Sequence, residues 1–138
     1  MTVRFVDTSV AVPLLLANHQ HHLSVNAHVG DALLGLTAHS AAETYSVLTR
    51  LPGDSRVIPA DALELMTERF NQLQAADQTS LDFVRRMAEV GIAGGAVYDA
   101  LVALAVARVV DGILLTRDLR AAATYMRLGV AVEYVADR

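Results

Sequence analysis

The stretch Val3-Arg4-Phe5-Val6-Asp7-Thr8-Ser9 is a short, mostly apolar run that leads directly into a carboxylate and two hydroxyls. Short apolar runs of this kind are typical of buried strands in parallel sheets. In open α/β sheets, ligands bind outside the carboxyl ends of the strands. We therefore expect Asp7 to lie at a ligand-binding edge of a sheet, and Ser9 to cap the helix that follows.

Alternating strand and helix patterns continue through the rest of the chain. Apolar runs predict strands at residues 33–37, 113–116 and 130–135, with a short fifth strand near Thr79. Helical patterns occupy residues 23–30, 40–51, 61–76, 80–90, 97–110 and 119–128. Strands that alternate with helices predict a parallel sheet covered on both faces. We expect residues 1–138 to form a single three-layer α/β/α domain with four to five parallel strands.

The composition excludes several classes of chemistry. The chain has no cysteine, which excludes disulfides, thiolate zinc sites and cysteine nucleophiles. All 11 basic side chains are arginine, and the absence of lysine excludes a P-loop and Schiff-base chemistry. No apolar run is long enough to span a membrane, so we expect a soluble, cytoplasmic protein. The net charge of −4 means that any contact with nucleic acid is local or made through metal ions.

Four acidic residues are predicted to lie at one edge of the sheet. Asp7 ends the first strand, Glu43 and Asp99 fall in the first turns of two predicted helices, and Asp118 follows the strand at 113–116. Local roles offer an alternative for three of them. Ser40 and Glu43 fit a capping-box pattern, while Asp99 and Asp118 are placed to complement helix dipoles. These local roles do not explain why four acids share one edge.

Carboxylates held close together repel one another and raise one another's pKa unless a cation is present. Mg²⁺ and Mn²⁺ prefer oxygen ligands, and such ions can orient a phosphodiester and generate hydroxide from bound water. The four acids therefore predict a Mg²⁺ or Mn²⁺ site that acts on a phosphate ester. A metal held there also explains how an acidic chain meets a phosphate backbone.

The chain resembles PIN-domain ribonucleases, and among them the VapC toxins of bacterial toxin–antitoxin modules. The order and spacing of four segments carry the resemblance: Val6-Asp7-Thr8-Ser9, Ala42-Glu43-Thr44-Tyr45, Tyr98-Asp99-Ala100-Leu101 and Leu115-Thr116-Arg117-Asp118. The resemblance implies a Mg²⁺- or Mn²⁺-dependent endoribonuclease whose catalytic and metal-binding residues are Asp7, Glu43, Asp99 and Asp118.

The resemblance implies further features of the site and of the assembly. Asp7 and Asp99 would be the firmest metal ligands, with Glu43 and Asp118 assisting. Thr8, Ser9 and Thr116 would support them through their hydroxyls. The resemblance also implies a homodimer, an RNA substrate and a VapB-type antitoxin whose C-terminal segment blocks the active site.

Two other functions compete with the ribonuclease. A haloacid-dehalogenase-like phosphatase needs a second acid two residues after Asp7 and a lysine, but this chain has Ser9 there and no lysine. A catalytically silent PIN-fold binding module remains an alternative, although acids at all four positions argue against it.

Histidines and arginines near the predicted edge are further candidates. His39 is a candidate substrate contact with an equally plausible packing role, and Arg117 is the arginine best placed to contact phosphate. The early histidines match no standard zinc spacing and are expected in a solvated loop and helix start: His19, His21, His22 and His28.

Overall fold

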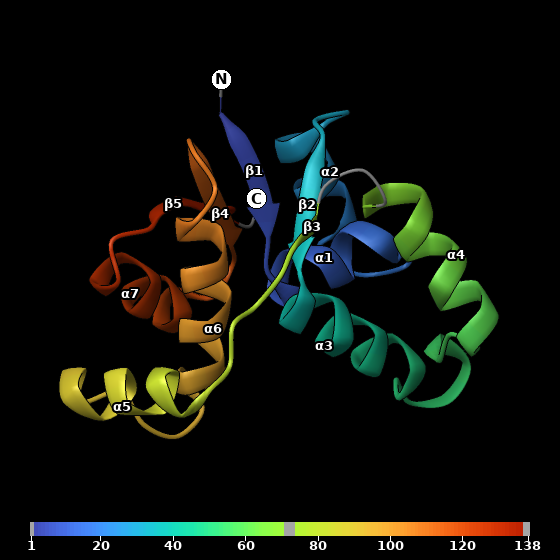
Figure 1. The fold of residues 1–138 in the computed structure, drawn as a ribbon. Helices are drawn as coiled ribbons and strands as arrows, with labels where there is room; N and C mark the ends of the chain where they lie inside the picture. The colour runs from blue at the N-terminus through green and yellow to red at the C-terminus, as the bar shows by residue number, and fades with distance from the viewer. Residues whose placement is uncertain (1, 71–73, 137–138) are drawn as a thin grey trace.

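The computed structural model describes residues 2–70 and 74–136, which form a five-stranded parallel sheet with helices on both faces (Figure 1). The strand order across the sheet is β3-β2-β1-β4-β5. The strands are β1 (Val3–Val6), β2 (Leu34–Thr37), β3 (Gln74–Ala75), β4 (Gly112–Thr116) and β5 (Ala131–Tyr134). The helices are α1 (Thr8–Leu15), α2 (His22–Val29), α3 (Ala38–Thr49), α4 (Pro59–Phe70), α5 (Leu81–Val90), α6 (Ala96–Ala107) and α7 (Leu119–Arg127), with a 3₁₀ turn, η1, at Gly53–Ser55. The predicted α/β/α architecture is confirmed.

The two faces of the sheet are packed by alternate residues of its central strands. Phe5 and Leu114 are fully buried against α6 and α7, whereas their neighbours Val6 and Leu115 are fully buried against α1 and α2. Successive strand residues point to opposite faces, so an uninterrupted apolar run is what a doubly covered strand requires. Burial of each such side chain stabilises the fold by roughly 1.5–3 kcal/mol.

Strand register brings the elements that carry the predicted acids to one edge. Phe5 lies beside Gly35 of β2 and Leu114 of β4, so the three strands end at nearly the same level. Helix α3 begins directly after β2, and α7 begins shortly beyond the end of β4. Helix α6 runs back toward the start of β4, which places the first turn of α6 at this same carboxyl edge.

The central helix α6 is apolar on nearly all sides, as predicted, and six of its residues are buried. It packs against the sheet on one side and against α5 through Ala100 and Leu101. Within residues 2–70 and 74–136, no helix has the length and apolar character needed to cross a membrane.

The predicted helix at residues 61–76 is wrong at its C-terminal end. Helix α4 begins at Pro59 and extends to Phe70, residues 71–73 lie outside the described part of the chain, and Gln74–Ala75 form β3. The fifth strand therefore lies before Thr79, paired in parallel with Leu36 and Thr37. A two-residue strand has no periodicity of its own, so its pairing with β2 could not be detected in the sequence.

Two predicted helix starts are also wrong. Ser9 does not cap α1, because the helix begins at Thr8 with Asp7 in the N-cap position. Ser40 does not cap α3, because the helix begins at Ala38 and the backbone N–H of Ser40 donates to the hydroxyl of Thr37. In both cases a residue nearer the strand end takes the capping position, which leaves Ser9 and Ser40 available for other contacts.

Gly112, the first residue of β4, has no room for a side chain. A Cβ there would lie 2.8 Å from the carbonyl oxygen of Val106 and 3.1 Å from that of Val109. We predict that Gly112→Ala lowers the free energy of unfolding by about 1–3 kcal/mol in urea denaturation, because backbone atoms must move. Gly95→Ala is the matched control, since a Cβ added at Gly95 would have no neighbour within 4 Å and its φ is −61°. Equal stability of the two variants would contradict the steric argument.

Candidate active site

The four predicted acids lie around one cavity at the carboxyl edge of the sheet. Asp7 follows β1, Glu43 lies on α3, Asp99 lies in the first turn of α6, and Asp118 occupies the N-cap position of α7. All four line a cavity of about 210 Å³. The remaining lining residues are Thr8, Ser9, His39, Ser40, Tyr98, Val102, Ala121 and Tyr125. The structure thus brings together four side chains that are separated by up to 111 residues in the sequence.

Asp7 is the most deeply buried of the four acids, with 5% of its surface exposed. Its Oδ1 accepts a hydrogen bond from the Ser9 hydroxyl at 2.5 Å, and its Oδ2 accepts one from the Tyr125 hydroxyl at 2.8 Å. Burial raises the pKa of Asp7, while these hydrogen bonds favour the ionised form and oppose the rise. Both oxygens are therefore fixed in position by neutral donors rather than by a positive charge.

Tyr125 is a site residue that the sequence does not reveal. Its side chain is 2% exposed and reaches Asp7 from α7, 118 residues away in the chain. Burial and the nearby charge of Asp7 both raise the pKa of the Tyr125 hydroxyl, so it stays protonated as a donor. No motif signals this role, because an aromatic residue on the buried face of an amphipathic helix is ordinary core material.

Hydroxyl groups tie the ends of β1 and β4 together. The Ser9 hydroxyl accepts from the backbone N–H of Arg117 at 2.8 Å and lies 3.3 Å from the hydroxyl of Thr116. Thr116 in turn accepts from the backbone N–H of Asp118 at 3.1 Å. The structure therefore places Ser9 and Thr116 where they orient the backbone that carries Asp7 and Asp118. The Thr8 hydroxyl is buried and makes no hydrogen bond within the described residues.

Asp99 lines the cavity and carries one oxygen without a hydrogen-bond partner among the described residues. This oxygen, Oδ2, is buried. Burial raises the pKa of Asp99; the positive charge of Arg120 lowers it, and the negative charges of Asp118, Asp7 and Glu43 raise it further. Unpartnered buried oxygens are rare in folded proteins, and a nearby cation would stabilise one that is surrounded by like charges.

Glu43 and Asp118 differ in how far the local alternatives explain them. The capping-box alternative for Glu43 fails because Thr37 caps the helix, and the Glu43 side chain remains 48% exposed. Asp118 does serve its helix, since its Oδ1 accepts from the backbone N–H groups of Arg120 and Ala121. Its Oδ2 lies 3.7 Å from the Arg120 guanidinium. Asp118 therefore has one oxygen committed to capping α7 and one that lies beside Arg120.

The donor set suits a hard divalent cation, although it does not form a closed cage. Within residues 2–70 and 74–136, no three histidine or acidic side chains converge into a ready metal-binding group. Mg²⁺ does not need such a cage, because it usually retains several waters and binds through one or two carboxylates. The unpartnered Asp99 oxygen and the repulsion among four carboxylates fit an ion of this kind.

The remaining candidates from the sequence divide between the cavity and the rest of the surface. His39 lines the cavity, with its Nε2 3.6 Å from Oε2 of Glu43. Arg117 contributes its backbone N–H to Ser9, and its side chain does not line the described cavity. The early histidines form no metal-binding group in the described chain: His22 contacts the carbonyl of Pro13, and His28 pairs with Glu133.

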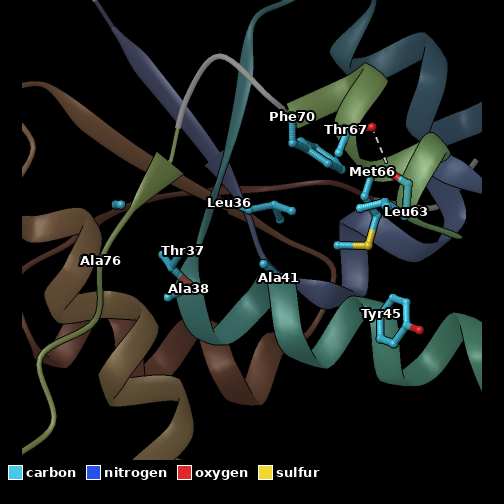
Figure 2. A pocket seen from close by; sticks show the side chains of 11 residues that line it. Leu36, Thr37, Ala38, Ala41, Tyr45, Leu63, Met66, Thr67, Phe70 and Ala76 are labelled. Carbon is cyan, nitrogen blue, oxygen red and sulfur yellow. Dashed lines mark hydrogen bonds between the residues drawn. The ribbon is translucent and has the colours of Figure 1, made fainter. Parts of the chain in front are cut away.

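A larger hollow of about 560 Å³ lies between α3 and α4 (Figure 2). Leu36 and Ala41 point toward Met66 and Phe70 across it, and Tyr45 lies at its edge. Its lining contains no acid, histidine or arginine among the described residues. Helix α3 therefore presents an apolar surface to this hollow and Glu43 to the smaller cavity, which is where the ionisable groups are concentrated.

Comparison with known proteins identifies the family. Residues 4–125 match the family model of the PIN domain. The chain is 51% identical to Ribonuclease VapC27 of Mycobacterium tuberculosis over 128 residues, which span 92% of this chain and 93% of that protein. It is 41% identical to Ribonuclease VapC40 of the same species over 133 residues, which span 94% and 96% of the two chains.

Solved structures agree in fold at lower sequence identity. The DNA-bound VapBC structure from Salmonella typhimurium matches with a TM-score of 0.64 and 15% identity, covering 99% of this chain and 100% of that one. VapC20 of M. tuberculosis, described as a toxin that cleaves the sarcin-ricin loop, matches with a TM-score of 0.61 and 20% identity, covering 87% and 93%. With the model match over residues 4–125, these findings show that the chain belongs to the PIN domain family.

Proposed function

We propose that this chain is a Mg²⁺- or Mn²⁺-dependent endoribonuclease that acts as the toxin of a VapBC-type toxin–antitoxin pair. The observation that carries the proposal is the cavity lined by Asp7, Glu43, Asp99 and Asp118, with its unpartnered Asp99 oxygen. Relatives at 51% and 41% identity are named ribonucleases, which supports RNA as the substrate class. A silent binding module is the alternative, but it gives no reason to keep four carboxylates in mutual repulsion.

In the proposed mechanism, Asp7 and Asp99 would hold the divalent ion, while Glu43 and Asp118 would bind water or complete its ligands. The bound ion would neutralise the phosphodiester and lower the pKa of an attacking water. The protein's own contribution is to keep the carboxylates in place. Tyr125 and Ser9 fix both oxygens of Asp7, so this ligand loses little conformational entropy when the ion binds.

Arg120 is placed to assist with the phosphate. It is the first arginine of α7, it lies 3.7 Å from Asp118, and its charge acts on Asp99. Its side chain is 74% exposed and can therefore turn toward a bound polyanion. An arginine beside the acids offsets locally the net charge of −4 that opposes RNA binding.

The proposed antitoxin would mask this cavity or its surroundings. Support comes from related folds that were solved as complexes, named VapBC from Salmonella typhimurium and FitAcB from Neisseria gonorrhoeae. These two structures share 15% and 18% identity with this chain. The antitoxin partner is therefore inferred from the proposed toxin function, with the two related structures as support.

Asp7→Asn is expected to reduce RNA cleavage by at least about a hundredfold, because it removes a charged ligand from the site while preserving shape. Cleavage is measured on total RNA by mapping new ends after incubation with each protein. The wild-type protein should lose activity in excess chelator and regain it with Mg²⁺ or Mn²⁺. Asp111→Asn is the matched control, since Asp111 precedes β4 at the opposite edge of the sheet. Wild-type cleavage by the Asp7→Asn protein would refute the mechanism.

The metal-free protein is expected to lose stability as pH rises. The folded-state pKa of Asp99 is raised above its ordinary value of 3.8, so the unfolded chain releases this proton first. The stability that the protonated Asp99 carboxyl contributes is fully present below pH 3.8 and is lost as the pH rises through the raised pKa of the folded state. The Asp99→Asn variant should therefore gain stability relative to wild type as pH increases, as measured by urea denaturation in chelator.

Mg²⁺ provides the second arm of this stability experiment. It should stabilise the wild-type protein most at the higher pH, where Asp99 is ionised, and stabilise the Asp99→Asn variant less. A stability difference between the two proteins that is independent of pH, together with equal responses to Mg²⁺, would show that Asp99 is not part of a metal site.

The antitoxin proposal predicts that a small protein encoded beside this one binds it and suppresses its toxicity. The Asp7→Asn protein should be tolerated by cells when expressed alone, yet still co-purify with that neighbour. The wild-type protein should arrest growth unless the neighbour is expressed with it. The antitoxin proposal would be contradicted if the neighbouring protein did not bind the wild-type protein and did not relieve the growth arrest.

A further inference from the structure

Two aromatic rings are stacked at the wall of the acid cavity. The rings of His39 and Tyr98 have centroids 5.2 Å apart and planes inclined by 14°. His39 lies in the first turn of α3 and Tyr98 in the first turn of α6, so the pair joins the two helices that carry Glu43 and Asp99. Both residues line the cavity.

His39 is the less exposed member of this pair. Burial raises the pKa of Asp77, on the segment after β3, and the backbone and charge of His39 lower it, so this carboxylate lies near the start of α3. On the other side, Nε2 of His39 lies 3.6 Å from Oε2 of Glu43, and the side chain is 24% exposed. The imidazole therefore lies between the Glu43 carboxylate and the Tyr98 ring, and its Nε2 makes no hydrogen bond among the described residues.

Tyr98 is the open member of the pair. It is 55% exposed although one face of its ring is covered by His39, so its exposed surface lies mainly on the other face and the ring edge. An exposed aromatic ring that is held by a second ring presents a flat apolar surface with little freedom to move. Tyr98 also directly precedes Asp99, which sets this surface one residue from a proposed metal ligand.

We propose that Tyr98, supported by His39, stacks on an unpaired base of a single-stranded RNA substrate next to the phosphate that is cleaved. This inference rests on the proposed ribonuclease function and adds the feature by which the site selects its substrate. Proteins bind single strands by stacking unpaired bases on aromatic side chains. Bases that are already stacked within a duplex cannot make this contact. Tyr98 touches the substrate in this scheme, and His39 is a positioning residue.

The pair is better explained by base stacking than by fold stability. Fold stability does not require Tyr98 to be exposed, and the neighbouring apolar residues of α6 already fill the core. Tyr45, which is 39% exposed on α3, lines the apolar hollow instead and provides an internal comparison. Only Tyr98 combines an exposed ring, a stacked support and a place at the cavity among the tyrosines that the structure describes.

Binding is tested with short single-stranded RNAs of mixed sequence in which one base at a time is replaced by 2-aminopurine, whose fluorescence is quenched by stacking. The Asp7→Asn chain serves as the parent, so the RNA is bound without being cut. Tyr98→Leu should abolish the protein-induced quenching at one position and weaken binding by about 5-fold to 150-fold. Tyr98→Phe should retain both, and the control Tyr45→Leu should match the parent.

His39 is tested through its coupling to Tyr98. His39→Ala should reduce quenching in the presence of Tyr98, but should have little further effect in the Tyr98→Leu background. In chains that keep Asp7, Tyr98→Leu should raise KM more than it lowers kcat. Circular dichroism establishes that each variant is folded.

The outcomes separate this inference from the function on which it rests. Parental quenching and affinity in Tyr98→Leu, with Asp7-dependent cleavage intact, would overturn the stacking surface and leave the ribonuclease standing. A loss in Tyr45→Leu instead of Tyr98→Leu would place the bound base in the apolar hollow and also overturn it. A chain that neither binds nor cleaves RNA would remove both proposals.

Discussion

A buried carboxylate without a positively charged partner is the feature on which the rest of this site depends. Asp7 is 5% exposed, and neutral hydroxyls from Ser9 and Tyr125 occupy its two oxygens. Hydrogen bonds of this kind offset only part of the cost of removing a charge from water, so burial still raises its pKa. The arrangement holds Asp7 in one geometry while leaving its charge largely uncompensated, which is what a metal ligand needs and what an ordinary core residue would avoid.

The sheet converts four separate sequence signals into one site. With the order β3-β2-β1-β4-β5, the central strand β1 has β2 on one side and β4 on the other. Helices α3 and α7 therefore begin on opposite sides of Asp7, and α6 returns between them. Asp118 caps α7, Asp99 lies in the first turn of α6, and Glu43 lies in the second turn of α3. The positions of the acids are set by the backbone near the strand ends. Hydrogen bonds such as that from the Asp118 N–H to the Thr116 hydroxyl restrict the movement of this backbone.

The range of each interaction decides whether the sequence could reveal it. The strands and Asp7 have local signals, since an apolar run and the acid that ends it are adjacent. Strand β3 has no such signal, because its two residues are defined by pairing with β2, and the apolar period of α4 continues beyond the last described residue of the helix. Contacts such as Tyr125 with Asp7 join residues 118 positions apart, and no local pattern encodes them.

The proposed metal site would also explain how an acidic protein binds a polyanion. The negative charges of Asp7, Asp99, Glu43 and Asp118 are concentrated around one cavity, so repulsion among them is strongest there. In the proposed mechanism, a divalent ion bound there would reduce this repulsion and offset much of the negative field that opposes a phosphate. In that mechanism, RNA binding at this point would depend on the metal. Repulsion among the acids lowers the stability of the metal-free protein. An ion that removed this repulsion would therefore bind more tightly.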